Sequence, residues 1–437
     1  MLIEFRVGNF RSFAEPQTFS LVANSDTRHP DNCIPFGKLM LLKSAAVYGA
    51  NASGKSNLIR ALDFMRLFVL SSATQMNIGD AIRVVPFQLN PELRDQASFF
   101  EAQLVVGEVR YQYGFTATSK RVQDEWLIAY PKGKARHLLE RDFDQETEQT
   151  TWAFRGELEK TGSLLKERTR DNGLALSRGA ELNIAPLTAV LLWFRQKMSV
   201  LNSPDQLDAL IHQTARRLEH DLTFRERIVR LLRHADLGIS DLELPPILHS
   251  FSSPSPDHAD DPDLPMKLFG RPGSSSRAYE PTGQLLQSIH QSQSGDRVPF
   301  SFLEAESNGT QRFFALAGLW LDALDQGGLL VIDELDSSMH PLLARKLVEL
   351  FQTRDANTKG AQLVFSTHDS VLMDLEIFRR DQIWLVEKDR AGASCLYSLY
   401  DFEERPRNNE AVGRRYLAGR FGGVPVFGPA FEDVELK

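Results

Sequence analysis

The sequence predicts an α/β fold: a mixed, largely parallel sheet with helices, an antiparallel β subdomain and a helical insertion. Three observations support this prediction. An apolar strand runs into a glycine loop and a helix near residues 43–67, a β-rich stretch covers about 82–130, and strands alternate with helices from about 310 to 400. The 437 residues are also more than one domain of about 150 residues requires.

The N-terminal third reads as strands around one helix. Apolar residues alternate where strands are expected, and from Lys55 onward they recur at helical spacing. Gly107 and Glu108 form a plausible hairpin turn between two apolar runs. The predicted strands are 2–7, 17–22, 43–48, 99–106, 109–116, 126–130 and 149–154.

The middle of the chain has a helical pattern from about 161 to 240. Residues 245–281 break this pattern, because eight of the 21 prolines and seven serines fall there. Such a composition buries little apolar surface and predicts a disordered loop. Regular elements then return, as helices at 310–325, 341–352 and 370–378 and strands at 329–333, 362–366, 382–388 and 394–400. These limits divide the chain into an N-terminal part (1–160), an insertion (161–294) and a C-terminal part (295–437).

Composition restricts the class of protein. Lys and Arg total 50 and Asp and Glu 58, so the net charge of -8 argues against a generic basic nucleic-acid coat. The two cysteines, Cys33 and Cys395, form no CxxC motif and predict neither a zinc site nor a disulfide framework. The sequence contains no predicted signal peptide and no apolar run of membrane-spanning length, so a cytoplasmic protein is expected.

The strongest motif is the octapeptide at 49–56, which fits G-x-x-x-x-G-K-[ST] between a predicted strand and a predicted helix. Glycines let the backbone wrap a phosphate, and backbone N–H groups with the helix N-terminus bind its oxygens. Lys55 would bridge the terminal phosphates of ATP, and the Ser56 hydroxyl would ligate Mg²⁺. The predicted nucleotide-binding residues here are Gly49, Asn51, Ser53, Gly54, Lys55, Ser56 and Asn57.

A second motif agrees with the phosphate loop. Residues 329–332 are an apolar strand that ends in Asp333 and Glu334. An aspartate at such a strand end holds Mg²⁺ in P-loop enzymes, so Asp333 is the second predicted metal ligand. A following glutamate can activate the attacking water, which makes Glu334 the predicted general base.

Three further segments distinguish among the classes of P-loop ATPase: 307–311 (Ser-Asn-Gly-Thr-Gln), 336–341 (Asp-Ser-Ser-Met-His-Pro) and 366–369 (Ser-Thr-His-Asp). Their order resembles the signature motif, D-loop and switch histidine of ABC-type ATPases, specifically the SMC-like branch. The opening segment 7–13 also looks like the start of an SMC-like head. The usual signature resembles LSGGQ. The form found here is similar to the overcoming-lysogenization-defect (OLD) and RloA/AbiL-type ATPases of bacterial anti-phage defence.

This resemblance implies further roles. His368 would sense the γ-phosphate, Asp336 would belong to the D-loop, and Ser307 and Gly309 would contact ATP bound to the opposite protomer. ATP would therefore be sandwiched in a homodimer, which could grow into a larger homo-oligomer. Gln88 is either the Q-loop glutamine or an ordinary exposed residue. Arg11 either approaches the nucleotide or is an ordinary surface arginine.

A nuclease domain of the OLD type is not expected. Glu387 superficially resembles the glutamate that opens a TOPRIM domain, but about 50 residues follow it and no D-x-D pair lies among them, so we interpret it as a structural strand-end acid. The resemblance then implies a separately encoded effector, nuclease-like in related systems. The basic, aromatic segment 414–422 is either a packed tail or a contact for a partner or nucleic acid. The alternative function is an SMC-like DNA-repair or DNA-binding ATPase, and no membrane role is expected.

Overall fold

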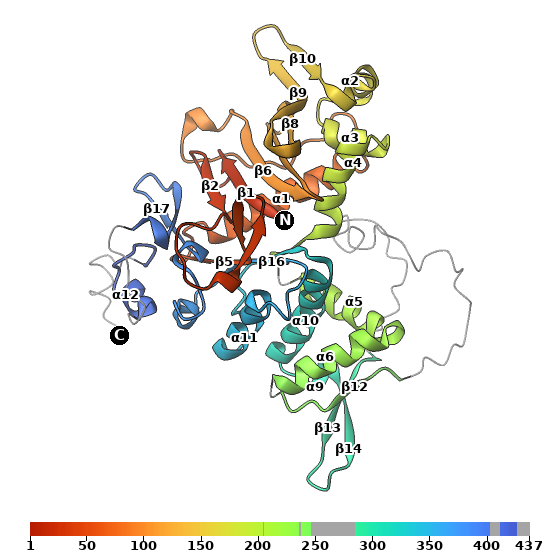
Figure 1. Cartoon of the computed structure of the whole chain (residues 1–437), viewed down its shortest axis with the longest axis vertical. Helices are drawn as coiled ribbons and strands as arrows, with labels where there is room; N and C mark the ends of the chain where they lie inside the picture. Colours follow the sequence, from red (N-terminus) through yellow and green to blue (C-terminus); the bar gives the residue numbers. More distant parts are fainter. Residues whose placement is uncertain (204, 236, 246–284, 403–410, 426–437) are drawn as a thin grey trace, which may run out of the picture. The chain divides into compact units, whose positions relative to one another are not determined.

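The computed structural model describes residues 1–203, 205–235, 237–245, 285–402 and 411–425 (Figure 1). They form two compact units. The first unit comprises Met1–Asn202, Asp322–Asp336 and Ala344–Lys437, and the second comprises Ser203–Leu321 and Ser337–Leu343. The second unit thus begins about 40 residues after the expected insertion does and continues beyond residue 294. Both sheets that frame the candidate site belong to the first unit.

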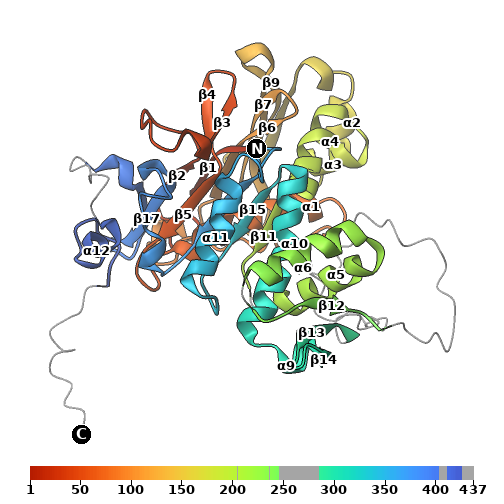
Figure 2. The same cartoon turned by 60° about the horizontal axis from the view of Figure 1, so that its bottom comes forward.

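A six-stranded sheet is the centre of the first unit, with the order β11-β15-β16-β5-β17-β18. Its first five strands are parallel and β18 is antiparallel. Strands β5, β15 and β16 are buried along their whole length, as expected for parallel strands covered on both faces. Figure 2 shows the red strand β5 among strands from later parts of the chain. The strands are β5 (Ser44–Tyr48), β11 (Met198–Leu201), β15 (Leu329–Ile332), β16 (Gln362–Ser366), β17 (Ile383–Lys388) and β18 (Ser394–Ser398).

A seven-stranded antiparallel sheet forms the other layer, with the order β10-β9-β8-β7-β6-β1-β2. The predicted α/β class with an antiparallel subdomain is therefore confirmed. The predicted hairpin is present as β6 and β7, whereas β9 was not expected. The strands are β1 (Leu2–Gly8), β2 (Gln17–Ser20), β6 (Ser98–Val106), β7 (Val109–Ala117), β8 (Val122–Tyr130), β9 (Arg136–Asp144) and β10 (Gln149–Phe154), and a small hairpin is formed by β3 (Cys33–Phe36) and β4 (Leu39–Leu42).

Helix α1 (Lys55–Ser71) joins the two layers. Its Phe64 and Phe68 rings contact Phe100 and Phe115 of the antiparallel sheet, and its Arg66 Nε donates to the carbonyl of Met198 on β11. The same helix therefore anchors the phosphate loop to both sheets. The other helices of this unit are α2 (Gly162–Arg168), α3 (Ala175–Glu181), α4 (Ala185–Leu192), α11 (Pro341–Gln352, in this unit from Ala344) and α12 (Val412–Leu417).

The prediction of a helix at 370–378 is wrong, because the structure has a 3₁₀ turn at Ser370–Leu372. The Asp369 side chain accepts from the N–H of Val371, and Asp374 accepts from the N–H of Glu376. Aspartate side chains that bond nearby backbone N–H groups compete with a continuous helix.

The second unit combines helices with a small sheet, which the expected helical insertion did not include. Strands β12, β13 and β14 form a three-stranded antiparallel sheet. The disordered loop expected at 245–281 lies outside the described residues from 246 onward. In the described part of the chain, no helix has the length and apolar character needed to cross a membrane. The elements are α5 (Gln206–His220), α6 (Leu222–His234), β12 (Asp241–Glu243), β13 (Gln287–Gln291), β14 (Arg297–Ser301), α9 (Phe302–Ala305) and α10 (Asn308–Gln326, in this unit to Leu321).

Candidate nucleotide site

The phosphate loop connects the end of β5 to the start of α1. Gly54 occupies the N-cap of α1, and no side chain caps that helix end. The first N–H groups of a helix have no intrahelical partner and carry partial positive charge, so they attract an anion. Ala52 adopts a left-handed backbone with φ of 61°, a conformation that non-glycine residues rarely adopt outside constrained sites. The loop therefore has the local geometry of a phosphate cradle.

Close packing explains the two glycines of the motif. A Cβ added to Gly49 would clash with the carbonyl oxygen of Val386, and one added to Gly54 would clash with the hydroxyl of Ser394. Gly54 also has φ of 124°, which only glycine adopts readily. Residues of the β17–β18 hairpin therefore pack against both glycines and restrict the conformation of the loop.

Lys55 lies inside the loop. Its Nζ donates to the carbonyl oxygens of Gly49 at 2.8 Å and Ala50 at 3.0 Å, and the residue is 5% exposed. Burial lowers the pKa of Lys55, while the carboxylates of Asp333, Glu334 and Asp336 act in the opposite direction. The acidic strand end is therefore close enough to Lys55 for its charges to act on the lysine.

The acidic residues follow β15, next to the end of β16. The Ser366 hydroxyl donates to Asp333 Oδ1 at 2.5 Å and accepts from the backbone N–H of Glu334 at 2.8 Å. Glu334 has a left-handed backbone, with φ of 52°. One serine therefore holds the Asp333 carboxylate and the Glu334 backbone, and the strain at Glu334 is of the kind that concentrates at functional sites.

His368 faces the second of these acids. Its Nε2 lies 3.9 Å from Glu334 Oε1, and its backbone N–H donates to Asp336 Oδ2 at 3.3 Å. The ends of β5, β15 and β16 meet at one edge, because the three strands are parallel neighbours. Loop lysine, paired acids and histidine are therefore assembled by topology, not by sequence proximity.

Two buried oxygens near this edge fit a polar ligand. Ser53 Oγ and Asp336 Oδ1 are buried without a hydrogen-bond partner, and such groups are costly unless something pairs with them. No group of three or more His, Cys, Asp or Glu within the described ranges could hold a metal alone. A magnesium ion that takes one or two protein ligands and completes its shell with phosphates and water fits Ser56 and Asp333.

The signature residues lie in the second unit. Ser307 caps α10, since its Oγ accepts from the N–H of Thr310 at 3.2 Å. A Cβ on Gly309 would clash with the carbonyl oxygen of Ser338, so glycine is required for the D-loop to pack on this turn. Gln311 braces the turn through bonds from its Nε2 to the carbonyls of Leu303 and Glu306.

The two uncertain candidates are placed differently. Gln88 is exposed, and its Nε2 donates to the carbonyl of Pro86. Arg11 has a left-handed backbone, and burial together with the charge of Arg60 lowers its pKa. Arg60 follows the phosphate loop on α1 and donates to Asn57 Oδ1 at 3.4 Å. The structure thus brings Arg11, rather than Gln88, to the start of α1.

Sequence reasoning assigned no role to three serines around the site, although Ser12 and Ser366 lie inside segments that it singled out. Ser366 aligns the acids, the Ser394 hydroxyl donates to the carbonyl of Ser53 at 2.5 Å, and the Ser12 hydroxyl accepts from Asn57 Nδ2 at 2.8 Å. Each comes from a segment distant in sequence. Their contacts could not be predicted from local motifs, because they depend on which strands become neighbours.

The C-terminal segment packs beside the phosphate loop. Glu387 Oε2 accepts from the N–H of Gly423 at 3.1 Å, and a Cβ on Gly423 would lie 3.6 Å from the Cα of Gly49. The Tyr416 ring is 5.9 Å from that of Tyr48. Within the described residues 411–425 the tail is packed, and Glu387 has a structural partner there.

Comparisons with known proteins agree with the motif analysis. A family model described as "AAA domain, putative AbiEii toxin, Type IV TA system" matches residues 44–374. Nothing among curated proteins matches the chain.

Solved structures of SMC heads are also similar to the chain, at low identity and a TM-score of 0.39 in each case. The SMC head domain from Thermotoga maritima is 15% identical, over 91% of this chain and 98% of that one. An SMC head bound to the C-winged helix domain of ScpA is 15% identical, over 91% and 97%. A head with a coiled coil and joint derived from Pyrococcus yayanosii is 12% identical, over 95% and 99%.

Proposed function

The chain belongs to the AAA-domain family whose model matches it, and on that premise we propose that it is an ATP-hydrolysing switch. One observation carries the proposal: Lys55, Asp333 and Glu334 meet at a single sheet edge, although almost 280 residues separate the lysine from the acids. A phosphate loop facing a strand-end carboxylate pair is the arrangement that phosphoanhydride hydrolysis requires.

The binding step uses the loop backbone and Lys55. The N–H groups at the start of α1 and the ammonium of Lys55 would hold the β- and γ-phosphates of ATP. Mg²⁺, held by Ser56 and Asp333, would supply Lewis-acid charge at the phosphate oxygens. Asn51, Ser53 and Asn57 would complete the loop's contacts. Ser366 would keep Asp333 turned toward this site.

The chemical step depends on Glu334. A water oxygen would attack the γ-phosphorus while the bond to the bridging β–γ oxygen breaks, and Glu334 would accept the proton of that water. His368, close to the same carboxylate, would contact the γ-phosphate and report its presence. The left-handed backbone of Glu334 would set the direction in which its side chain leaves the strand end.

A nucleotide sandwich would complete the site. Ser307 and Gly309 lie at the N-terminus of α10, a helix end suited to a phosphate. We assign these residues, with Asp336 and the D-loop, to the γ-phosphate of ATP on a second copy of the chain. ATP binding would then close a homodimer and hydrolysis would reopen it.

The output of the switch would be a separate effector protein. The family description refers to a toxin and a toxin–antitoxin system, and the motif order resembles defence ATPases that act with a second protein. These features support control of a toxic or nuclease-like effector in anti-phage defence.

The test is Glu334→Gln, which keeps the shape of the side chain and removes its basicity. We expect ATP turnover to fall by about 10²–10⁴-fold while ATP binding persists and the ATP-bound dimer accumulates in light scattering. Glu108→Gln, an exposed turn residue, is the matched control. Turnover by Glu334→Gln at the control rate would refute the assignment of the general base.

A further inference from the structure

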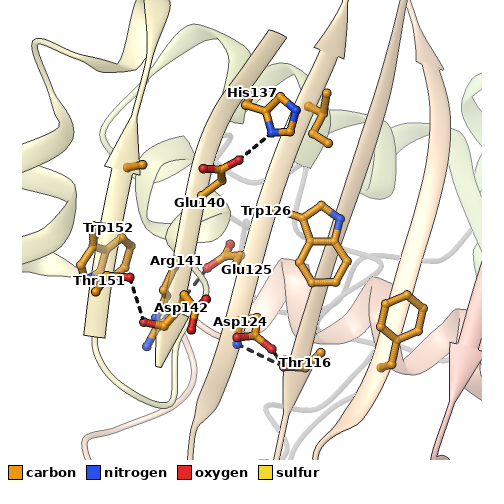
Figure 3. Close-up of a pocket in the computed structure, with 13 residues that line it drawn as sticks. Thr116, Asp124, Glu125, Trp126, His137, Glu140, Arg141, Asp142, Thr151 and Trp152 are labelled. Atoms are coloured by element: carbon orange, nitrogen blue, oxygen red, sulfur yellow. Dashed lines mark hydrogen bonds and ion pairs between the residues drawn. The ribbon is translucent and has the colours of Figure 1, made fainter. Parts of the chain in front are cut away.

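The outer face of the seven-stranded sheet is hollowed into a pocket of about 680 Å³, lined by side chains from β6 to β10 (Figure 3). This volume lies within the range of ligand sites. It belongs wholly to the first unit, and the residues proposed for ATP chemistry are not part of its lining. The residues that decide its chemistry are Phe99, Asp124, Trp126, Asp142 and Trp152.

Aromatic rings form much of the wall. Phe99 stacks on Trp126 with ring centroids 5.7 Å apart, and Trp126 Nε1 donates to Glu101 Oε2 at 2.9 Å, which fixes the indole. Trp152 stacks on Phe154, and the guanidinium of Arg141 lies 5.0 Å from its ring centroid. Aromatic faces attract cations through the ring quadrupole. The guanidinium of Arg141 therefore already occupies part of the space over the Trp152 ring. Trp126, in contrast, lies beside Asp124 and Asp142.

Two carboxylates oppose each other within this pocket. Asp124 on β8 and Asp142 on β9 are direct cross-strand partners, and like charges in that arrangement are destabilising. Burial raises the pKa of Asp124 and the charge of Asp142 adds to the increase, whereas the Thr116 hydroxyl and the charge of Arg141 counteract it. The unfavourable pairing persists in a solvent-accessible hollow, where an external cation could relieve it.

The other charged groups of the pocket have partners. His137 Nδ1 lies 2.6 Å from Glu140 Oε1, and Arg155 lies 3.6 Å from the same carboxylate. Arg141 pairs with Glu125 at 3.8 Å, and both side chains are almost fully buried. In the described part of the chain, the ion pairs of this sheet involve residues other than Asp124 and Asp142. The charge of Arg141 acts on Asp124, but its ion pair is with Glu125, so the two aspartates are the carboxylates of the lining without an ion pair of their own.

We propose that this pocket is a docking site for a basic segment of a partner protein, whose arginine or lysine side chain inserts beside Trp126 and binds between Asp124 and Asp142. The volume admits a long side chain and its flanking backbone. Its negative charge would repel nucleic-acid phosphates, and the chain's net charge of -8 steers a basic partner toward it. The proposal does not depend on the ATPase assignment.

The test uses a fluorescein-labelled Gly-Arg-Gly-Arg-Gly peptide and the full chain, read by fluorescence polarisation. The same peptide with Glu in place of Arg is the ligand control. We expect Asp124→Asn with Asp142→Asn to weaken binding by about tenfold, and Trp126→Leu by about threefold to tenfold. The charge-matched control is Glu146→Gln with Glu167→Gln, both exposed, for which we expect less than a twofold change.

Folding of each variant is checked by its thermal midpoint and ATP turnover, neither of which should fall. A photo-reactive version of the peptide on the unmodified chain gives a second readout, with crosslinks expected on β8 and β9. Equal weakening by the two double variants, equal binding of the two peptides, or crosslinks elsewhere would overturn the proposal. So would an oligomeric mass that changes with Asp124→Asn and Asp142→Asn, since the occupant would then be another copy of the chain.

Discussion

The edge of the six-stranded sheet and the outer face of the seven-stranded sheet handle charge in opposite ways. At the edge, Ser366 holds Asp333, and Lys55 lies against the loop carbonyls within reach of the acids. On the face, the like-charged Asp124 and Asp142 are direct cross-strand partners, although the Thr116 hydroxyl donates to Asp124. Loops at the ends of neighbouring strands can bring together acidic and basic side chains from several segments of the chain. On a sheet face, the register of the strands alone decides which side chains are neighbours.

This difference teaches how the two surfaces would respond to a ligand. The edge is preorganised, since its charged groups are already aligned by bonds within the chain. The face stores an unfavourable like-charge pair that a cationic partner would neutralise. We therefore expect substitutions at the edge to change the rate of ATP hydrolysis, and substitutions on the face to change the stability of the fold and the binding of a partner.

The largest effect is expected for Lys55→Met, which removes the cation of the phosphate loop. We expect ATP affinity or turnover to fall by more than about 100-fold, as for loss of a preorganised electrostatic contact to phosphate. Isothermal titration and a phosphate-release assay measure the two quantities. Lys38→Met, at an exposed lysine, should behave as wild type. Wild-type turnover by Lys55→Met would show that this lysine does not bind the phosphates.

A smaller effect is expected for Ser366→Ala. The change frees Asp333 and Glu334 from their shared hydroxyl, and loss of a hydrogen bond to a charged group corresponds to about tenfold in rate. Steady-state turnover at saturating Mg²⁺ and ATP measures it. Ser366→Thr keeps the hydroxyl and should recover most of the activity; if it is as slow as Ser366→Ala, packing and not alignment explains the loss.

The smallest effect concerns the sheet face. Asp142→Asn removes a like-charge contact, so we expect the free energy of unfolding at pH 7 to rise by a few tenths of a kcal/mol. Because Asp124 has a raised pKa, its ionisation costs stability at neutral pH and the cost disappears as the pH falls toward about 4. The gain should therefore shrink over that interval in chemical denaturation.

A neighbouring residue supplies a control of opposite sign. Backbone N–H groups of Thr147 and Glu146 lower the pKa of Asp144 on the same strand, so Asp144→Asn should reduce stability at pH 7. Equal changes in the free energy of unfolding for Asp142→Asn and Asp144→Asn would mean that cross-strand repulsion plays no part.

The edge was largely predictable from the sequence and the face was not. Segments 49–56 and 329–334 carry local spacing that predicts the strand ends and the helix start found there. The β6–β7 hairpin was also predicted, because apolar alternation and a turn mark it. The opposition of Asp124 and Asp142 depends on the register of β8 and β9, and β9 escaped prediction, since its nine residues (Arg-His-Leu-Leu-Glu-Arg-Asp-Phe-Asp) are mostly polar.

The failed predictions have similar causes. The segment 370–378 has helical apolar spacing, but Asp369 and Asp374 bond the nearby backbone and end the turns. Strand β11 escaped because its four residues follow a helix without a turn signal, and its pairing with β15 is a long-range event. The signature turn was recognisable, whereas the contact of Gly309 with Ser338 depends on the fold.

The position of β5 has a consequence for synthesis of the chain. This strand pairs with β16 on one side and β17 on the other, more than 300 residues later, and Gly423 closes against Gly49. A nascent polypeptide that has left the ribosome only as far as α10 has the phosphate loop but neither neighbouring strand. Contacts of such separation form slowly, so competence to bind ATP arises late and all at once, when the last strands arrive.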